Sequence, residues 1–341
     1  MQLRFGFCLP IFAMPGNAFF RTPNYAQLDA STTLAMARQA EELGYDSLWV
    51  ADHLMLGKDQ AILEGWTTLA ALAGCTTRAR LGIIHYSNPM RHPSMTAKMT
   101  ATLDQISGGR LIHFFDCGNN RREHCAYGLP WDEEAEGRIS RMEEALDLTL
   151  ALWQAAEPLD FTGRYYHLEQ ALCKPGPAQV PHPPVWLGEA HPLILDLCAR
   201  RAQGWNTTPV SLPELDRRLQ ALGAACQRAG RPLNDIEKSF ETQILIAPDL
   251  EALRRSLNQI LARSSTPPAE ELAAFAQGRT DQLPPSLTDS FLVGTPDQVT
   301  AQVEAYRQRD IAHFMLWFMD APDAAGLELF AREVMPRFRS T

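Results

Sequence analysis

Two clusters of reactive side chains follow short apolar runs early in the chain. Asp52 and His53 come after the run at 47–51, and His85 comes after the run at 81–84. A histidine titrates at about pH 6.5, so an imidazole near a carboxylate can take up a proton at neutral pH and return it. Adjacent residues of a strand point to opposite faces, so Asp52 and His53 can act together only if the strand ends between them. We interpret His53, Asp52 and His85 as candidate catalytic residues for acid–base chemistry.

The apolar runs in front of these clusters are typical of strands that are covered on both faces, as in a parallel sheet with crossover helices. In such proteins the polar groups at the carboxyl ends of the strands line the functional site. Eight runs of this kind alternate with helical patterns, which predicts a closed α/β fold, the (β/α)8 TIM barrel. The expected strands lie at 4–11, 47–53, 81–87, 111–117, 184–188, 204–208, 240–247 and 313–319.

Helices are predicted between these strands, for example at 28–43, which ends before Gly44, and at 138–153. We expect one domain over residues 1–341 with insertions after the fourth and seventh strands. Residues 157–183 read as a hairpin followed by a proline-rich loop. Residues 248–290 read as a helical insertion of the kind that forms active-site lids.

The composition excludes several classes of protein. The 341 residues are 45% hydrophobic and 21% charged, which is an ordinary globular composition. A net charge of −9 argues against a nucleic-acid partner. The apolar start of the chain is too short to span a membrane, so we expect no membrane association and a cytoplasmic location. Seven scattered cysteines without a CxxC pair indicate reduced thiols.

Five motifs run through the chain in a fixed order. They are AEELGYDSLWVADH at 40–53, MRHP at 90–93, TLD and SGGR within 102–110, PPVWLG at 183–188 and VGTPDQV at 293–299. By these motifs the chain resembles the luciferase-like flavin-dependent monooxygenase superfamily, a group of (β/α)8 barrels that includes deazaflavin-dependent oxidoreductases. The resemblance covers nearly the whole chain.

The resemblance implies where a flavin would bind. In that family the ring lies across the carboxyl ends of the strands, against a bulge with an unusual cis peptide after the third strand. The matching residues here are Tyr86, Ser87 and Asn88, with the cis bond expected at Tyr86–Ser87 or Ser87–Asn88.

The cofactor phosphate would lie after the fifth strand, where free backbone N–H groups and a helix dipole attract an anion. The residues there are Gly188, Glu189, Ala190 and His191, and Glu189 is unfavourable beside a phosphate unless it turns away. This turn favours a single phosphate, as in FMN, over a longer anionic tail.

The turn after the fourth strand departs from the glycine-rich form of many relatives. Three polar residues are predicted to hydrogen-bond the ring edge or the substrate, namely Asp116, Asn119 and Asn120. Arg121 or Arg122 is predicted to bind a phosphate or an anionic substrate. Cys117 is either a reactive thiol near the ring or a small residue that fills the strand end.

The leading hypothesis is a two-component-type monooxygenase. A partner flavin reductase would deliver reduced FMN, and the enzyme would use O2 to oxidise a small organic substrate. The first alternative is hydride transfer through a deazaflavin, which the stretches at 49–53 and 88–93 favour.

Two further alternatives belong to other classes. One is a metal-dependent barrel hydrolase with Asp52, His53, His85 and Asp116 as ligands, although no H-x-H or HExxH spacing supports a metal site. The other is a binding barrel without flavin. The resemblance also implies a homodimer through the helices after the second and third strands, where Ala70, Ala71, Ala73 and Gly74 offer small side chains.

Overall fold

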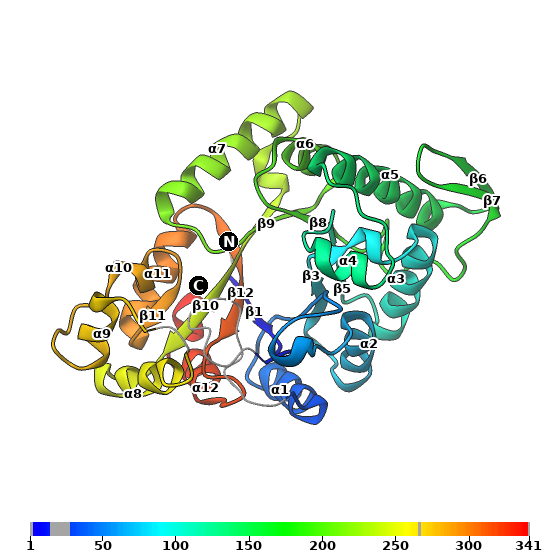
Figure 1. Ribbon diagram of the computed structural model, residues 1–341. Coiled ribbons are helices and arrows are strands. Elements are labelled where there is room, and N and C mark those ends of the chain that lie inside the picture. The colour runs from blue at the N-terminus through cyan, green and yellow to red at the C-terminus, as the bar shows by residue number, and fades with distance from the viewer. Residues whose placement is uncertain (1–2, 14–27, 265–266, 340–341) are drawn as a thin grey trace.

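Eight parallel strands close on themselves at the centre of the molecule (Figure 1). The computed structural model describes residues 3–13, 28–264 and 267–339. The pairing order is β12-β1-β2-β3-β5-β8-β9-β10, and β10 pairs with β12 to close the ring. The predicted barrel is therefore confirmed. In chain order the barrel strands are β1 (Arg4–Cys8), β2 (Ser47–Ala51), β3 (Arg80–Ile84) continued by β4 (Tyr86–Ser87), β5 (Leu111–Asp116), β8 (Val185–Gly188), β9 (Gly204–Thr207), β10 (Glu237–Ile246) and β12 (Ile311–Phe318).

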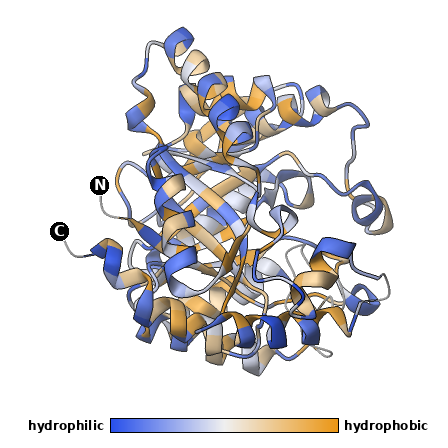
Figure 2. Ribbon diagram, turned by 90° about the vertical axis from the view of Figure 1, so that its left-hand side faces the viewer, coloured by the Kyte–Doolittle hydropathy of each residue, from blue (hydrophilic) through white to orange (hydrophobic). Residues whose placement is uncertain are grey.

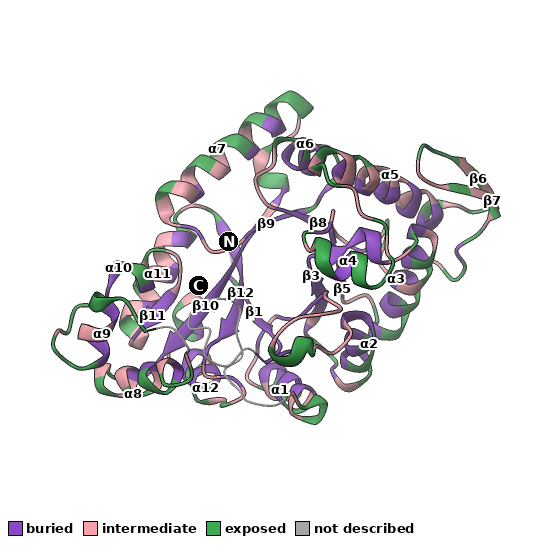
Figure 3. Ribbon diagram, in the orientation of Figure 1, coloured by how far each residue is buried: buried purple, intermediate pink, exposed green. Residues whose placement is uncertain are grey.

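Helices surround the barrel, with buried inner faces and exposed outer faces (Figure 3). Apolar residues concentrate on the strands and on the inner sides of the helices (Figure 2), as expected for a helix ring packed on a parallel barrel. No helix within the described ranges is long and apolar enough to cross a membrane. The α-helices are α1 (Ala30–Glu42), α2 (Gly65–Cys75), α3 (Pro93–Ser107), α4 (Arg121–Ala126), α5 (Ala135–Gln154), α6 (Pro192–Arg201), α7 (Leu212–Ala229), α8 (Leu250–Leu261), α9 (Glu270–Ala276), α10 (Pro285–Thr288), α11 (Pro296–Arg307), α12 (Ala325–Glu333) and α13 (Met335–Arg339).

Within the described ranges, three strands lie outside the ring. The antiparallel pair β6 (Leu159–Thr162) and β7 (His167–Ala171) forms a hairpin beyond α5 (Figure 1). Strand β11 (Leu292–Gly294) pairs in parallel with the carboxyl end of β10. Around β11, helices α8 and α9 share a separate hydrophobic cluster that includes Phe275 and Val293. The division of the chain into one domain with two insertions stays a prediction.

Two tryptophans fill the barrel interior, and glycines on the neighbouring strands make room for them. The rings of Trp49 and Trp186 lie 5.4 Å apart. A Cβ atom on Gly82 would lie 2.1 Å from the Trp49 ring, and one on Gly204 would lie 2.3 Å from the Trp186 indole nitrogen. Because this packing fills the lower part of the barrel, functional side chains must gather at the carboxyl ends of the strands.

The third barrel strand is interrupted at His85. Its φ of 58° lies in the left-handed region, which non-glycine residues rarely adopt. The expected cis bond at Tyr86–Ser87 or Ser87–Asn88 is wrong, because the cis bonds of the described residues all precede prolines, at Pro175, Pro181 and Pro322. The left-handed backbone of His85 breaks the strand instead.

Candidate active site at the barrel mouth

Asp52 and His53 both follow the end of β2 at Ala51, and each has its own partner. The Asp52 carboxylate is buried and accepts two hydrogen bonds from Arg91, at 2.9 and 3.0 Å. It also accepts the backbone N–H of Ser87 at 2.9 Å. Asp52 therefore ties β2 to the turn after β4, and its charge is neutralised by Arg91. This arrangement suits a positioning role.

His53 is bound to a carboxylate that the sequence did not single out. Its Nδ1 lies 2.9 Å from Glu123 Oε1, and Glu123 Oε2 accepts the backbone N–H groups of Leu54 and Met55. Burial alone would raise the pKa of Glu123, but the hydrogen bonds from His53 and the two amides outweigh it and hold the pKa below its ordinary value. An ionised Glu123 accepts the Nδ1 proton, so Nε2 of a neutral His53 carries the lone pair. Nε2 has no partner among the described residues, which leaves it able to accept a proton from a ligand.

His85 lies between two carboxylates. Its Nδ1 is 3.3 Å from Asp116 Oδ2 and its Nε2 is 3.0 Å from Glu241 Oε2. The other oxygen of each carboxylate is held by an N–H group, from Gly118 for Asp116 and from Trp317 for Glu241. Two carboxylate acceptors are both satisfied when the imidazole carries both protons. His85 thus bridges the barrel from the end of β3 to β10.

The residues that follow the break in β3 differ in where their side chains lie and what they bind. The Tyr86 ring points outward, where its hydroxyl bonds Thr96 of α3, so only its backbone can face a ligand. The Ser87 hydroxyl lies 3.1 Å from His124 Nε2, and the Asn88 amide donates to the Tyr166 hydroxyl at 3.4 Å.

Several side chains of the turn after β5 already have partners within the protein. Asn120 caps α4, and Asn119 is exposed. Burial and the Asp116 charge raise the pKa of the Cys117 thiol to about 12, which opposes a reactive-thiolate role. Arg121 pairs with the exposed carboxylate of Glu133 at 2.7 Å.

The predicted phosphate end lies at the start of α6. Gly188 is buried, and Ala190 is half-buried. Glu189 is paired with Arg218 of α7 at 2.9 Å, so its charge is neutralised. His191 caps α6, where its Nδ1 accepts the backbone N–H of Leu193.

Arg138 at the start of α5 offers a cation for this end of the mouth. Its guanidinium lies over the Trp131 ring at 4.4 Å and donates to the backbone carbonyls of Asp132 and Glu133. Its Nε atom is buried without a partner among the described residues. The Arg138 charge also lowers the pKa of Cys117, which places it beside the end of β5. A guanidinium with an unused donor fits a phosphate-bearing cofactor.

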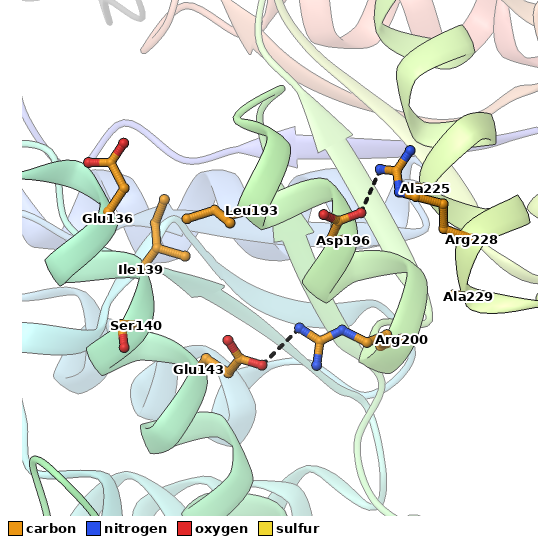
Figure 4. A pocket seen from close by; sticks show the side chains of 10 residues that line it. All are labelled: Glu136, Ile139, Ser140, Glu143, Leu193, Asp196, Arg200, Ala225, Arg228 and Ala229. Carbon is orange, nitrogen blue, oxygen red and sulfur yellow. Dashed lines mark hydrogen bonds and ion pairs between the residues drawn. The ribbon is translucent and has the colours of Figure 1, made fainter.

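A groove of about 540 Å³ runs along the outside of α5, α6 and α7, starting beside the α6 N-terminus (Figure 4). Its two arginines are already paired, Arg200 with Glu143 at 2.8 Å and Arg228 with Asp196 at 2.6 Å. Glu136 adds an exposed carboxylate at the end nearest His191. The groove therefore carries one more negative than positive side chain.

The four residues of the metal hypothesis do not form one cluster, although His85 and Asp116 contact each other. Asp52 is bound to Arg91, His53 to Glu123, and His85 to Asp116 and Glu241. Among the described residues, no group of three or more histidine, cysteine or carboxylate side chains could hold a metal ion.

Sequence reasoning missed Glu123, Glu241 and Arg138. Glu241 had a signal, since a carboxylate at an inward position of a buried barrel strand requires a partner. Glu123 and Arg138 had none, because their roles depend on where helices α4 and α5 lie in space.

Comparison with known proteins agrees with this fold. A family model described as luciferase-like monooxygenase matches residues 10–313. The F420-dependent glucose-6-phosphate dehydrogenase of Beutenbergia cavernae is 30% identical over 320 residues, which cover 90% of this chain and 93% of that protein. A solved F420-dependent secondary alcohol dehydrogenase in complex with an F420–acetone adduct superposes with a TM-score of 0.78 at 19% identity, covering all of both chains. The EDTA monooxygenase of Chelativorans sp. BNC1 superposes with a TM-score of 0.80 at 18% identity, covering 99% of this chain and 94% of that one.

Proposed function

The chain belongs to the luciferase-like monooxygenase family, and from this premise we propose that it transfers a hydride between the deazaflavin F420 and a small alcohol or carbonyl compound. The chain is an enzyme of the oxidoreductase class, of the flavin type. The relative that is 30% identical over nearly its whole length is named F420-dependent, which supports the deazaflavin over FMN.

The observation that carries the proposal is the pairing of His53 with Glu123. An alcohol that loses a hydride must also lose its hydroxyl proton, and a carbonyl that gains one must gain a proton. Nε2 of His53 can accept and return this proton, because Glu123 holds the opposite nitrogen as a donor. His53 and Glu123 thus have the roles of acid–base and of its orienting carboxylate.

The remaining residues would bind and shield the cofactor. Arg138 and the capped start of α6 at His191 would hold the phosphate, and the backbone from His85 to Asn88 would face the ring. Bound there, a deazaflavin supplies the hydride chemistry at its ring. The pairing of Asp52 with Arg91 keeps the turn after β4 in place. The tryptophans packed in the lower part of the barrel would exclude water from the site on that side.

The second candidate is the monooxygenase that uses reduced FMN, O2 and a partner flavin reductase. The groove of Figure 4 favours it, because a long anionic tail leaving the α6 N-terminus would meet paired arginines and the surplus carboxylate of Glu136. FMN ends at its phosphate and does not need this groove.

Absorbance under strictly anaerobic conditions separates the two candidates. The protein with F420 and a panel of small alcohols is expected to reduce the deazaflavin without O2. Turnover that needs O2, FMN and a flavin reductase, with F420 left oxidised, would replace the first candidate with the second.

We also propose that the protein is a homodimer through α2 and α3. Ala70, Ala71 and Gly74 are exposed on α2, whereas Ala73 is buried. On α3, Met95 and Ile106 are 56% and 61% exposed. These two residues are eleven positions apart, which is three helical turns, so they share one face.

A further inference from the structure

Two arginines stack on one tyrosine beside the β6–β7 hairpin. Arg141 belongs to α5, and Arg164 lies in the turn between β6 and β7. Their guanidinium carbons lie 4.5 Å and 5.0 Å from the centre of the Tyr165 ring. Neither guanidinium has a hydrogen bond or an ion pair among the described residues, and the Tyr165 hydroxyl is buried without a partner there. These three residues, the hairpin cluster, therefore carry unused donors.

The carboxylate of Glu144 lies next to this cluster and is held by the backbone of the hairpin turn. It accepts the N–H groups of Arg164, Tyr165 and Tyr166, each at 2.8 Å. Two guanidinium groups thus share the turn with one carboxylate, and that carboxylate already accepts three hydrogen bonds. The set as a whole is positively charged, so it attracts anions.

The hairpin cluster lies on the side of α5 that faces away from the groove of Figure 4. An α-helix turns by about 100° per residue, so side chains two positions apart point in nearly opposite directions. Glu136 and Glu143 line the groove, and Arg138 and Arg141 each stand two positions from one of them. The arginines of the groove are paired with carboxylates, whereas Arg138 and Arg141 form no ion pair within the described ranges.

The cluster adjoins the barrel mouth. Tyr166, which follows Tyr165 in the hairpin turn, accepts a hydrogen bond from Asn88 after the break in β3. Arg141 lies three residues beyond Arg138, the residue that would hold the cofactor phosphate. Three residues of helix span about 4.5 Å, so a short chain attached to that phosphate would reach Arg141.

We infer that the hairpin cluster binds the anionic tail of the deazaflavin, in which carboxylates follow the phosphate. The tail leaves the mouth along the hairpin side of α5 and not along the groove. Guanidinium groups bind carboxylates through paired N–H donors, so Arg141 and Arg164 are the tail-binding residues. The inference rests on the proposed function and adds to it the place where the tail binds.

Equilibrium titration with two forms of the cofactor tests the inference. One is F420 with its chain of glutamates, and the other is the deazaflavin monophosphate, which ends at its phosphate as FMN does. The wild type is expected to bind F420 at least tenfold more tightly than the monophosphate. The hairpin variant, Arg141→Gln with Arg164→Gln, is expected to lose this preference and to keep the Kd of the monophosphate within twofold.

Two further double variants serve as controls. The groove variant, Arg200→Gln with Arg228→Gln, removes the same number of charges from the other side of α5, and its Kd for F420 should stay within twofold of wild type. Arg141→Lys with Arg164→Lys keeps both charges and loses the planar groups. It should recover most of the affinity that the hairpin variant loses.

Several results would overturn the inference. Equal affinity of the wild type for the two forms would mean that the tail makes no contact. A groove variant that weakens F420 as much as the hairpin variant does would place the tail in the groove, and a lysine variant as weak as the glutamine variant would show that charge does not bind it. A hairpin variant that loses both forms alike would place these arginines on the phosphate. Failure of the wild type to bind either form would instead refute the proposed function, and the inference with it.

Discussion

His53 and His85 are both imidazoles at the barrel mouth, and their partners give them different capacities. One nitrogen of His53 faces Glu123 and the other has no partner among the described residues, so this ring can exchange a proton. Both nitrogens of His85 face carboxylates, so its protons are already engaged. We therefore propose that His53 rather than His85 transfers the proton.

Replacing His53 by asparagine tests this assignment. Asparagine can still donate to Glu123 but cannot take up a proton, so turnover with F420 is expected to fall by about 10²–10⁴ while the Kd of F420 stays unchanged. Stopped-flow absorbance and an equilibrium titration measure the two quantities. The matched control is His167→Asn on the exposed hairpin strand β7. Turnover by His53→Asn within twofold of wild type would remove His53 from the mechanism.

Sequence reasoning found Asp52, His53 and His85 because they follow apolar runs, and strand ends of a parallel barrel meet at one face. It could not say which carboxylate serves His53. The neighbouring Asp52 turned out to bind Arg91, and the partner Glu123 lies 70 residues away on another element. Such pairings depend on helix placement, which no local pattern encodes.

At the scale of elements, the loop between β12 and α12 contains a buried carboxyl whose pKa is raised. Asp320 follows β12, and its Oδ2 accepts the backbone N–H of Gly326 at 2.7 Å. Its Oδ1 is buried without a partner among the described residues. Burial raises the pKa of Asp320 from 3.8 to about 7, which outweighs the hydrogen bond from Gly326.

This shift makes stability depend on pH with a defined sign. Between pH 3.8 and about 7 the Asp320 carboxyl is protonated in the folded protein but not in the unfolded chain. Proton binding therefore stabilises the folded state, and this stabilisation is lost as the pH rises. Relative to Asp320→Asn, the unfolding free energy of the wild type is expected to fall by about 1.4 kcal/mol per pH unit over this range and to level off above it. Urea unfolding of both proteins at pH 4 to 8 measures the difference. A flat or rising difference would show that Asp320 is ionised in the folded state.

All eight barrel strands were expected at the right places and in the right order, with bounds that differ by a few residues. Strand β11 was not predicted, although Val293 and Gly294 stand in the VGTPDQV motif, because a three-residue strand is too short to show a period. The break at His85 was expected as a bulge. Its left-handed backbone conformation was not expected, because no sequence pattern marks a histidine that adopts a positive φ.

At the scale of the whole molecule, the exposed face of α3 is expected to be covered by a second copy. Met95→Glu combined with Ile106→Glu would place two charges in that contact, so the mass by sedimentation should fall from twice the chain mass to 38.0 kDa. Val180→Glu, at a site that is 93% exposed in the proline-rich loop, is the control and should stay dimeric. A wild type that sediments as a monomer at tens of micromolar would contradict the dimer.

The proposed function requires a phosphate-bearing flavin-type cofactor in the barrel mouth, and equilibrium titration of the pure protein with F420 and with FMN tests this directly. We expect saturable binding of F420, weaker binding of FMN, and at least a tenfold loss of affinity for both in Arg138→Gln, because a phosphate would lose its guanidinium. Arg255→Gln on α8, where the arginine side chain is exposed and pairs with Glu251, is the control and should bind as the wild type does. If neither cofactor binds at high micromolar concentration, or if Arg138→Gln binds as tightly as its control, the assignment of the mouth is wrong.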